Sequence, residues 1–161
     1  MLEHFRSDAP TPDVMAAIER DGATIVEGFL PPERVDALAA DFRPELDAVP
    51  WGNTGENDVD AFFGHHTKRL HGLVGRSKHV GELLVEPLFR AMCDHFLSAH
   101  TRDYRLSTGE LMAIGQGQAE QAVHRDADSW YHMPQPRPDL LVSANVALTD
   151  FTEHNLSLIH I

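Results

Sequence analysis

Residues 121–130 read Gln-Ala-Val-His-Arg-Asp-Ala-Asp-Ser-Trp, and the pair His124 and Asp126 in this stretch decides how the chain is interpreted. We predict a β-strand here, because side chains two residues apart on a strand share a face, about 6.5–7 Å apart. An imidazole nitrogen and a carboxylate oxygen placed in this way can bind one metal ion. They would supply two corners of the 2-His-1-carboxylate site that is typical of non-haem Fe(II) oxygenases.

The His-x-Asp triplet alone is a weak signal. The chain has 11 histidines and 25 acidic residues among 161, so about two His-x-acidic triplets are expected by chance, and one is present. A polar strand end with a surface aspartate would have the same sequence. The interpretation therefore depends on the sequence around the triplet.

Composition limits the class of protein. A length of 161 residues, 42% hydrophobic and 24% charged, fits a single globular domain. The net charge of −12 argues against nucleic acid and anionic membranes as partners, because both require clustered basic residues. Cys93 is the only cysteine, so no internal disulfide can form. No apolar leader or membrane-length run is present, and we expect a soluble, cytoplasmic protein.

Local signals predict helices in the first hundred residues. Thr11-Pro12 marks a helix start and Gly22 its end, and apolar residues at helical spacing predict a second helix over 32–48. Ser77 caps a short helix that runs to Leu84, and Pro87 begins another. Between these helices we expect a loose arm at 1–10, a strand at 23–29, a loop at 50–60 and an extended segment at 62–73.

Strand signals dominate the rest of the chain. We predict strands at 104–107, 110–114, 119–126 and 140–151, with a turn at 115–118. The predicted fold class is mainly β with N-terminal helices (α+β). One domain is expected over 1–155, with a mostly helical part at 11–100 and a β part at 104–155.

Four segments in this order resemble the phytanoyl-CoA dioxygenase family, which comprises Fe(II)- and 2-oxoglutarate-dependent oxygenases. They are DGATIVEGFLPPERVDAL at 21–38, HHTKRLHGLVGRS at 65–77, ELMAIGQGQAEQAVHRDADSW at 110–130 and RPDLLVSANVALTDFTEHN at 137–155. The resemblance implies a double-stranded β-helix, the cupin-like jelly roll of eight strands with helices packed outside it.

The resemblance also implies roles for five residues. His124 and Asp126 match the metal ligands, and Lys68 matches a lysine that contacts 2-oxoglutarate. Met112 is expected to line the same pocket, and Asn145 matches a further pocket position. The implied cofactors are Fe(II), 2-oxoglutarate and O2, and the implied reaction hydroxylates a small organic molecule or acyl substrate while 2-oxoglutarate yields succinate and CO2. Halogenation is disfavoured, because related halogenases carry a small residue where this chain has Asp126.

The chain departs from the family after Asn155. The family continues with Gly, a small residue and Thr, a Pro-Gly-Ser-His turn, and later a second metal histidine and an arginine. This chain reads LSLIHI over 156–161, where neither His154 nor His160 matches the distal ligand. We therefore expect a C-terminally truncated fragment with an incomplete jelly roll, a non-native tail at 156–161, weak Fe(II) binding and no activity of its own.

Two other functions remain open from the residues alone. One is a non-catalytic binding module, in which a half-barrel is completed by a partner chain. The other is a cupin-like metal hydrolase or isomerase that binds Zn²⁺ or Mn²⁺ without 2-oxoglutarate. The sequence specifies neither the substrate nor the oligomeric state.

Overall fold

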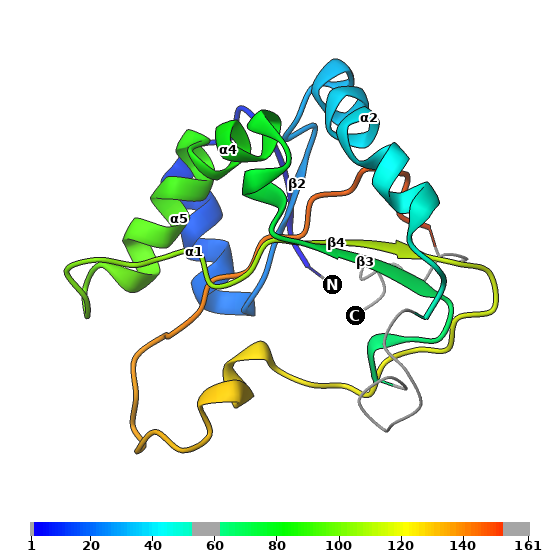
Figure 1. Cartoon of the computed structure of the whole chain (residues 1–161). Coiled ribbons are helices and arrows are strands. Elements are labelled where there is room, and N and C mark those ends of the chain that lie inside the picture. The colour runs from blue at the N-terminus through cyan, green and yellow to red at the C-terminus, as the bar shows by residue number, and fades with distance from the viewer. Residues whose placement is uncertain (1, 53–61, 153–161) are drawn as a thin grey trace.

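Helices make up most of the regular structure in the computed structural model, which describes residues 2–52 and 62–152 (Figure 1). No helix within those two ranges is both long and apolar enough to span a bilayer. The helices agree closely with those expected from the sequence. They are α1 (Thr11–Asp21), α2 (Pro32–Ala48), α4 (Lys78–Leu84) and α5 (Pro87–Leu97), with 3₁₀ turns η1 (Leu73–Gly75) and η2 (Asp126–Trp130).

Local sequence signals explain where these helices begin and end. Gly22 ends α1 in the left-handed conformation (φ 80°), and its N–H donates to the carbonyl of Ile18. The hydroxyl of Ser77 accepts hydrogen bonds from the backbone N–H groups of His79 and Val80 at the start of α4. A proline occupies the first turn of α1, α2 and α5, where its missing N–H costs no helical hydrogen bond.

The strands in the described residues form two separate pairs. β1 (His4–Arg6) pairs in parallel with β2 (Ile25–Glu27), so the expected loose arm at 1–10 contains a strand. β3 (Thr67–His71) pairs antiparallel with β4 (Glu110–Ile114), with Lys68 opposite Ala113 and Arg69 opposite Met112. The predicted strands at 23–29 and 110–114 are thereby confirmed, the first in shorter form.

The core lies between α2, the β3–β4 pair and α4. Leu38 and Phe42 of α2 pack with Leu70 of β3 and Leu111 of β4. Phe42 is only 1% exposed. Leu30, Leu73 and Val80 complete the cluster, so the apolar stripe of α2 covers one face of the β3–β4 pair.

The prediction of a mainly β fold with N-terminal helices is met only in part, because the described residues form helices and two small sheets. Segments 104–107, 119–126 and 140–151 carry strand-like sequences but run without a ladder partner, and Asp126 begins the 3₁₀ turn η2. A strand needs a neighbour to pair its backbone N–H and C=O groups, and within residues 2–52 and 62–152 the strand pairs are β1 with β2 and β3 with β4. The described residues therefore do not form a complete jelly roll. The expected loop at 50–60 and tail at 156–161 lie largely or wholly outside the described residues.

Asp41 joins α2 to the start of α4. Its carboxylate accepts a hydrogen bond from the Ser77 hydroxyl and lies 2.8 Å from Nδ1 of His79. The hydrogen bond from Ser77, followed by that from His79, lowers the pKa of the Asp41 carboxyl. The ionised carboxylate therefore stabilises the fold above its unfolded-state pKa, and this stabilisation is lost as the pH falls below about 4.

We predict that Asp41→Asn lowers the melting temperature at pH 7 and that the difference from the parent chain shrinks as the pH falls from 5 to 2. Thermal melts followed by circular dichroism at several pH values measure this difference. Asp36→Asn, which changes an exposed carboxylate on the same helix, is the matched control and should leave the melting temperature unchanged. A pH-independent effect of Asp41→Asn would contradict the prediction.

Candidate metal site

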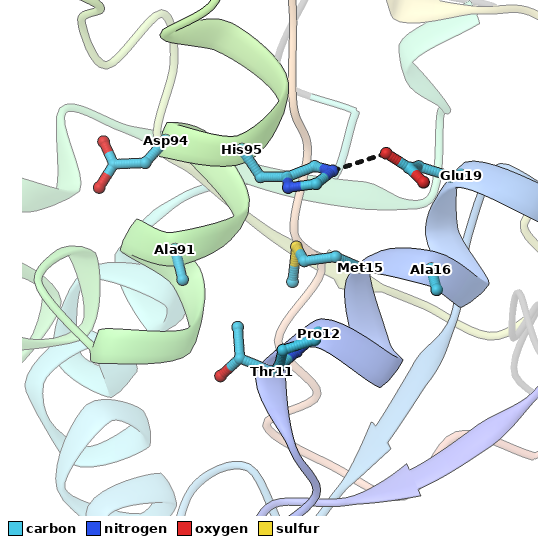
Figure 2. Close-up of a pocket in the computed structure, with 8 residues that line it drawn as sticks. All are labelled: Thr11, Pro12, Met15, Ala16, Glu19, Ala91, Asp94 and His95. Atoms are coloured by element: carbon cyan, nitrogen blue, oxygen red, sulfur yellow. Dashed lines mark hydrogen bonds and ion pairs between the residues drawn. The ribbon is translucent and has the colours of Figure 1, made fainter.

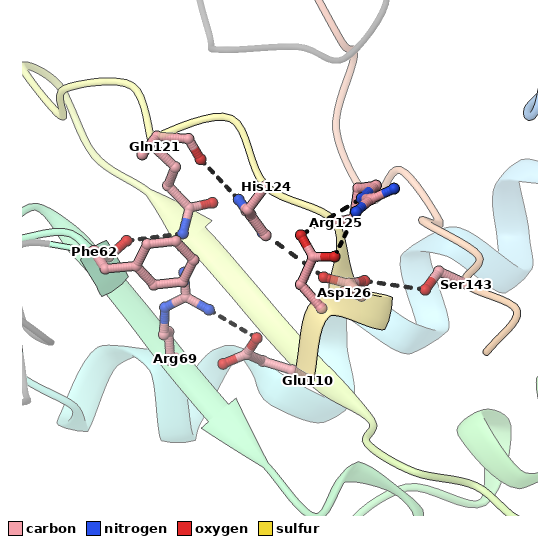
Figure 3. A network of polar contacts seen from close by, with 10 residues as sticks. Phe62, Arg69, Glu110, Gln121, His124, Arg125, Asp126 and Ser143 are labelled. Carbon is pink, nitrogen blue, oxygen red and sulfur yellow. Dashed lines mark hydrogen bonds and ion pairs between the residues drawn. The ribbon is translucent and has the colours of Figure 1, made fainter. Parts of the chain in front are cut away.

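His124 and Asp126 lie close together, although the strand predicted for them is absent. His124 Nε2 is 3.7 Å from Asp126 Oδ1, and both side chains are substantially exposed (Figure 3). The chain turns into η2 at Asp126, immediately after an extended Arg125. The two groups are therefore close at an extended Arg125, although residues 121–125 are not paired in a sheet.

The protonation pattern of His124 follows from its backbone contact. Nδ1 lies 2.8 Å from the carbonyl oxygen of Ala122. A carbonyl can only accept a hydrogen bond, so Nδ1 carries the proton, and in the neutral ring Nε2 keeps its lone pair. Phe62 packs edge-to-face against the imidazole, with ring centroids 4.8 Å apart. Nε2 is thus the atom available to a metal, and it faces Asp126.

Asp126 has a second partner that sequence reasoning missed. The hydroxyl of Ser143 donates to Asp126 Oδ2 at 3.1 Å (Figure 3). Ser143 belongs to the extended segment 140–151, 17 residues further along the chain. One serine within LLVSANVAL carried no signal that would single it out, because only the tertiary arrangement brings it to the carboxylate.

The donor atoms of His124 and Asp126 fit a single metal ion. Two ligand atoms that each lie about 2.1 Å from one ion can be at most about 4.2 Å apart, and 3.7 Å is within that limit. One imidazole and one carboxylate suit Fe(II) or Mn(II). In the part of the chain that the structure describes, no three His, Cys, Asp or Glu side chains gather closely enough to hold a metal. Within the described residues, His124 and Asp126 are therefore a pair of candidate donors without a third.

Arg137 holds the turn that carries Asp126. Its guanidinium donates to the carbonyl of Trp130 at 2.6 Å and to the carbonyl of Ala127 at 3.2 Å. Arg125 pairs with Asp128 at 2.8 Å on the exposed side of the same turn. The two arginines stabilise η2 from both sides, and the sequence motif had indicated neither.

Gln121 and Phe62 connect the His124 segment to the β3–β4 pair. Gln121 Nε2 donates to the carbonyl of Phe62 at 2.8 Å. The next residue, Phe63, accepts a hydrogen bond from Arg69 Nε at 3.1 Å, and the Arg69 guanidinium lies 4.9 Å from the Phe63 ring. Arg69 also forms a 2.7 Å ion pair with Glu110 of β4 (Figure 3). The face of the β3–β4 pair that carries Arg69 is therefore turned toward His124.

The structure separates Lys68 from Met112. Met112 lies opposite Arg69 and shares its face, whereas Lys68 lies on the other face with the core residue Leu70. Lys68 Nζ donates to the carbonyl of Leu46 in α2 at 2.6 Å. The ammonium also lies 4.8 Å from the centroid of the Trp51 ring. The two residues expected to line one pocket are thus on opposite faces, because the register of β3 and β4 turns Lys68 toward α2.

Asn145 follows the serine that contacts Asp126. It is exposed and follows two residues after Ser143 on the extended segment 140–151. Its role in the pocket stays a prediction.

Comparison with known proteins decides the family. Residues 18–159 match the family described as Phytanoyl-CoA dioxygenase (PhyH). The chain belongs to this family. Curated relatives include Dioxygenase hkm4 of Aspergillus hancockii (32% identical, covering 94% of this chain and 52% of the relative) and Dioxygenase aneA of Aspergillus aculeatus (31%, 96% and 54%). The Fe(II)/2-oxoglutarate-dependent dioxygenase nvfF of Aspergillus novofumigatus is 30% identical over 89% of this chain and 51% of its own length.

The family membership inferred from the four sequence segments is thereby confirmed. His124, Asp126 and Ser143 all lie within the matched residues. This phytanoyl-CoA dioxygenase family chain spans about half the length of the curated relatives it matches.

This family member also has a hollow between α1 and α5, lined by residues that are distant in sequence from His124 and Asp126 (Figure 2). His95 Nε2 and Glu19 Oε1 approach to 2.7 Å across its rim. None of His124, Asp126, Lys68, Met112 or Asn145 contributes to this hollow. The residues that line it are Thr11, Pro12, Met15, Ala16, Glu19, Ala91, Asp94 and His95.

Proposed function

We propose that this chain supplies the histidine and the carboxylate of the iron site in an Fe(II)- and 2-oxoglutarate-dependent dioxygenase that hydroxylates a small organic molecule or acyl substrate. The observation that carries the proposal is the 3.7 Å approach of His124 Nε2 to Asp126 Oδ1, with Nδ1 engaged by the Ala122 carbonyl. The relative named as an Fe(II)/2-oxoglutarate-dependent dioxygenase supports it.

His124 and Asp126 would hold the iron. When bound, Fe(II) would supply the oxidation of a substrate C–H bond by O2, coupled to conversion of 2-oxoglutarate to succinate and CO2. The chain's own residues prepare the ligands for this ion. The Ala122 carbonyl keeps the proton of His124 on Nδ1, and the Phe62 ring covers one side of the imidazole.

The contacts to 2-oxoglutarate are a further part of the proposal. Met112 is the better placed of the two β3–β4 candidates, because it shares the face of Arg69 that is turned toward His124. Lys68 would have to leave the Leu46 carbonyl and the Trp51 ring to reach that face. Asn145 is proposed as a pocket residue on the strength of its place two residues after Ser143. We also infer that β3 and β4 are the first pair of the family's jelly roll.

Titration with Mn(II), followed by NMR of the ¹⁵N-labelled chain, tests the site. Mn(II) takes the same nitrogen and oxygen ligands as Fe(II) and broadens resonances close to it. We expect selective broadening of the amides of residues 122–128 at low Mn(II), and its loss in His124→Ala. His132→Ala, which removes an exposed histidine a few residues further on, should leave the broadening in place.

The acidic surface makes this a demanding test. With a net charge of −12, the chain attracts Mn(II) through many carboxylates, which would broaden resonances over the whole surface. Broadening that is dispersed in this way, or that is unaffected by His124→Ala, would contradict the proposed function.

A further inference from the structure

We propose that Ser143 is a positioning residue for Asp126, whose hydroxyl holds the carboxylate so that Oδ1 faces Nε2 of His124. The inference rests on the proposed role of His124 and Asp126 as metal ligands. It adds a residue that neither the His-x-Asp motif nor the family match assigns.

The two oxygens of the Asp126 carboxylate have different neighbours. Oδ2 accepts a hydrogen bond from the Ser143 hydroxyl at 3.1 Å, and Oδ1 lies 3.7 Å from His124 Nε2 (Figure 3). An aspartate side chain has three staggered χ1 rotamers and a broad, roughly two-fold χ2, so an exposed aspartate such as Asp126 has several orientations open to it. A contact from outside the turn is needed to fix the carboxylate, and Ser143 makes that contact.

Arg125 is not available for this task. It is the cationic side chain adjacent to Asp126 in sequence, but its guanidinium pairs with Asp128 at 2.8 Å. A neutral hydroxyl also suits the role chemically. It donates to the oxygen that faces away from His124 and brings no positive charge that would repel a metal cation.

The segment that follows Ser143 packs on the core. Val146 and Leu148 lie against the cluster formed by α2, β3–β4 and α4. Ser143 itself is exposed, three residues before Val146. The core contact of Val146 therefore anchors the chain close to Ser143 by residues outside the η2 turn.

The first test needs no metal. Three-bond couplings from Cγ of Asp126 to its carbonyl carbon and amide nitrogen report the χ1 rotamer by NMR. In the parent chain we expect coupling constants typical of a single χ1 rotamer. In Ser143→Ala we expect coupling constants averaged over several rotamers. Ser143→Thr keeps the hydroxyl and should retain a single rotamer.

The second test measures Mn(II) affinity by titration of the NMR broadening at residues 122–128. Ser143→Ala should raise the Kd about tenfold, the low end of the effect of residues that orient a metal ligand. Ser143→Thr should restore the parent Kd to within about twofold. Ser129→Ala removes an exposed hydroxyl from η2 itself and should leave the Kd unchanged.

The two tests separate this inference from the proposed function. If the parent chain shows no Mn(II) binding at His124, the proposed function fails, and the couplings of Asp126 alone decide whether Ser143 orients the carboxylate. Asp126 couplings that do not change in Ser143→Ala would overturn the inference. So would a Ser143→Thr variant that binds Mn(II) as weakly as Ser143→Ala.

Discussion

In the dioxygenase proposed above, replacement of Asp126 by alanine should lower 2-oxoglutarate turnover at least about 1000-fold, which corresponds to about 4 kcal/mol of lost transition-state stabilisation. The reason is the loss of one of the two metal donors that the described residues bring together. His124→Ala should have an effect of the same size. Succinate formation, measured with substrate present and Fe(II) in excess, reports the change.

Asp128→Ala provides a matched control for this prediction. It removes a carboxylate from the same η2 turn, but one that pairs with Arg125 and does not face His124. We expect its turnover to stay within about threefold of the parent, a change of less than 1 kcal/mol. If Asp126→Ala kept more than a tenth of the parent rate, Asp126 would not be a ligand of the catalytic metal.

Arg69→Met should destabilise the fold by about 3–5 kcal/mol, the usual cost of removing one partner of a buried ion pair. The Arg69 side chain is only 7% exposed, and the paired Glu110 carboxylate is 18% exposed. Without the guanidinium, Glu110 keeps His71 as a neighbour, with Nε2 3.4 Å from Oε1. Urea unfolding followed by tryptophan fluorescence measures the loss.

The double variant Arg69→Met with Glu110→Leu separates the contribution of the ion pair to stability from the contribution of side-chain packing. Replacing both partners of a buried ion pair by apolar residues of similar volume is often neutral, so we expect the double variant to recover most of the lost stability. If the double variant were as unstable as Arg69→Met, the contribution of Arg69 would come from its contacts with Phe63 and not from the ion pair.

Arg69 also links the fold to the candidate site. Its contacts with Phe63 hold the segment whose preceding residue, Phe62, touches His124 and accepts a hydrogen bond from Gln121. A mobile Phe63 would therefore loosen the packing of the imidazole. We expect Arg69→Met to broaden the NMR signals of His124 even under conditions in which the chain stays folded.

Signals that act over a few residues predicted the helices well. The backbone groups at a helix end lack partners within the helix, whatever surrounds it. Gly22 and Ser77 provide hydrogen bonds at such ends, and Pro87 has no N–H group that would need one. The strands predicted at 104–107, 119–126 and 140–151 are not formed, because a strand depends on more than its local sequence. A strand depends on a neighbouring strand for its hydrogen bonds, and an alternating sequence does not state whether that neighbour is present.

The sequence by itself determined the family and the helices and indicated His124 and Asp126 as the candidate ligand pair, because motif order, helix caps and the His-x-Asp triplet can be read without the fold. Only the tertiary structure decided how these residues are used. The register of β3 against β4 turned Lys68 toward α2, and a shift of one residue would have reversed its face. The fold also brings the Ser143 hydroxyl to the Asp126 carboxylate, because contacts between distant residues form only when the core has packed.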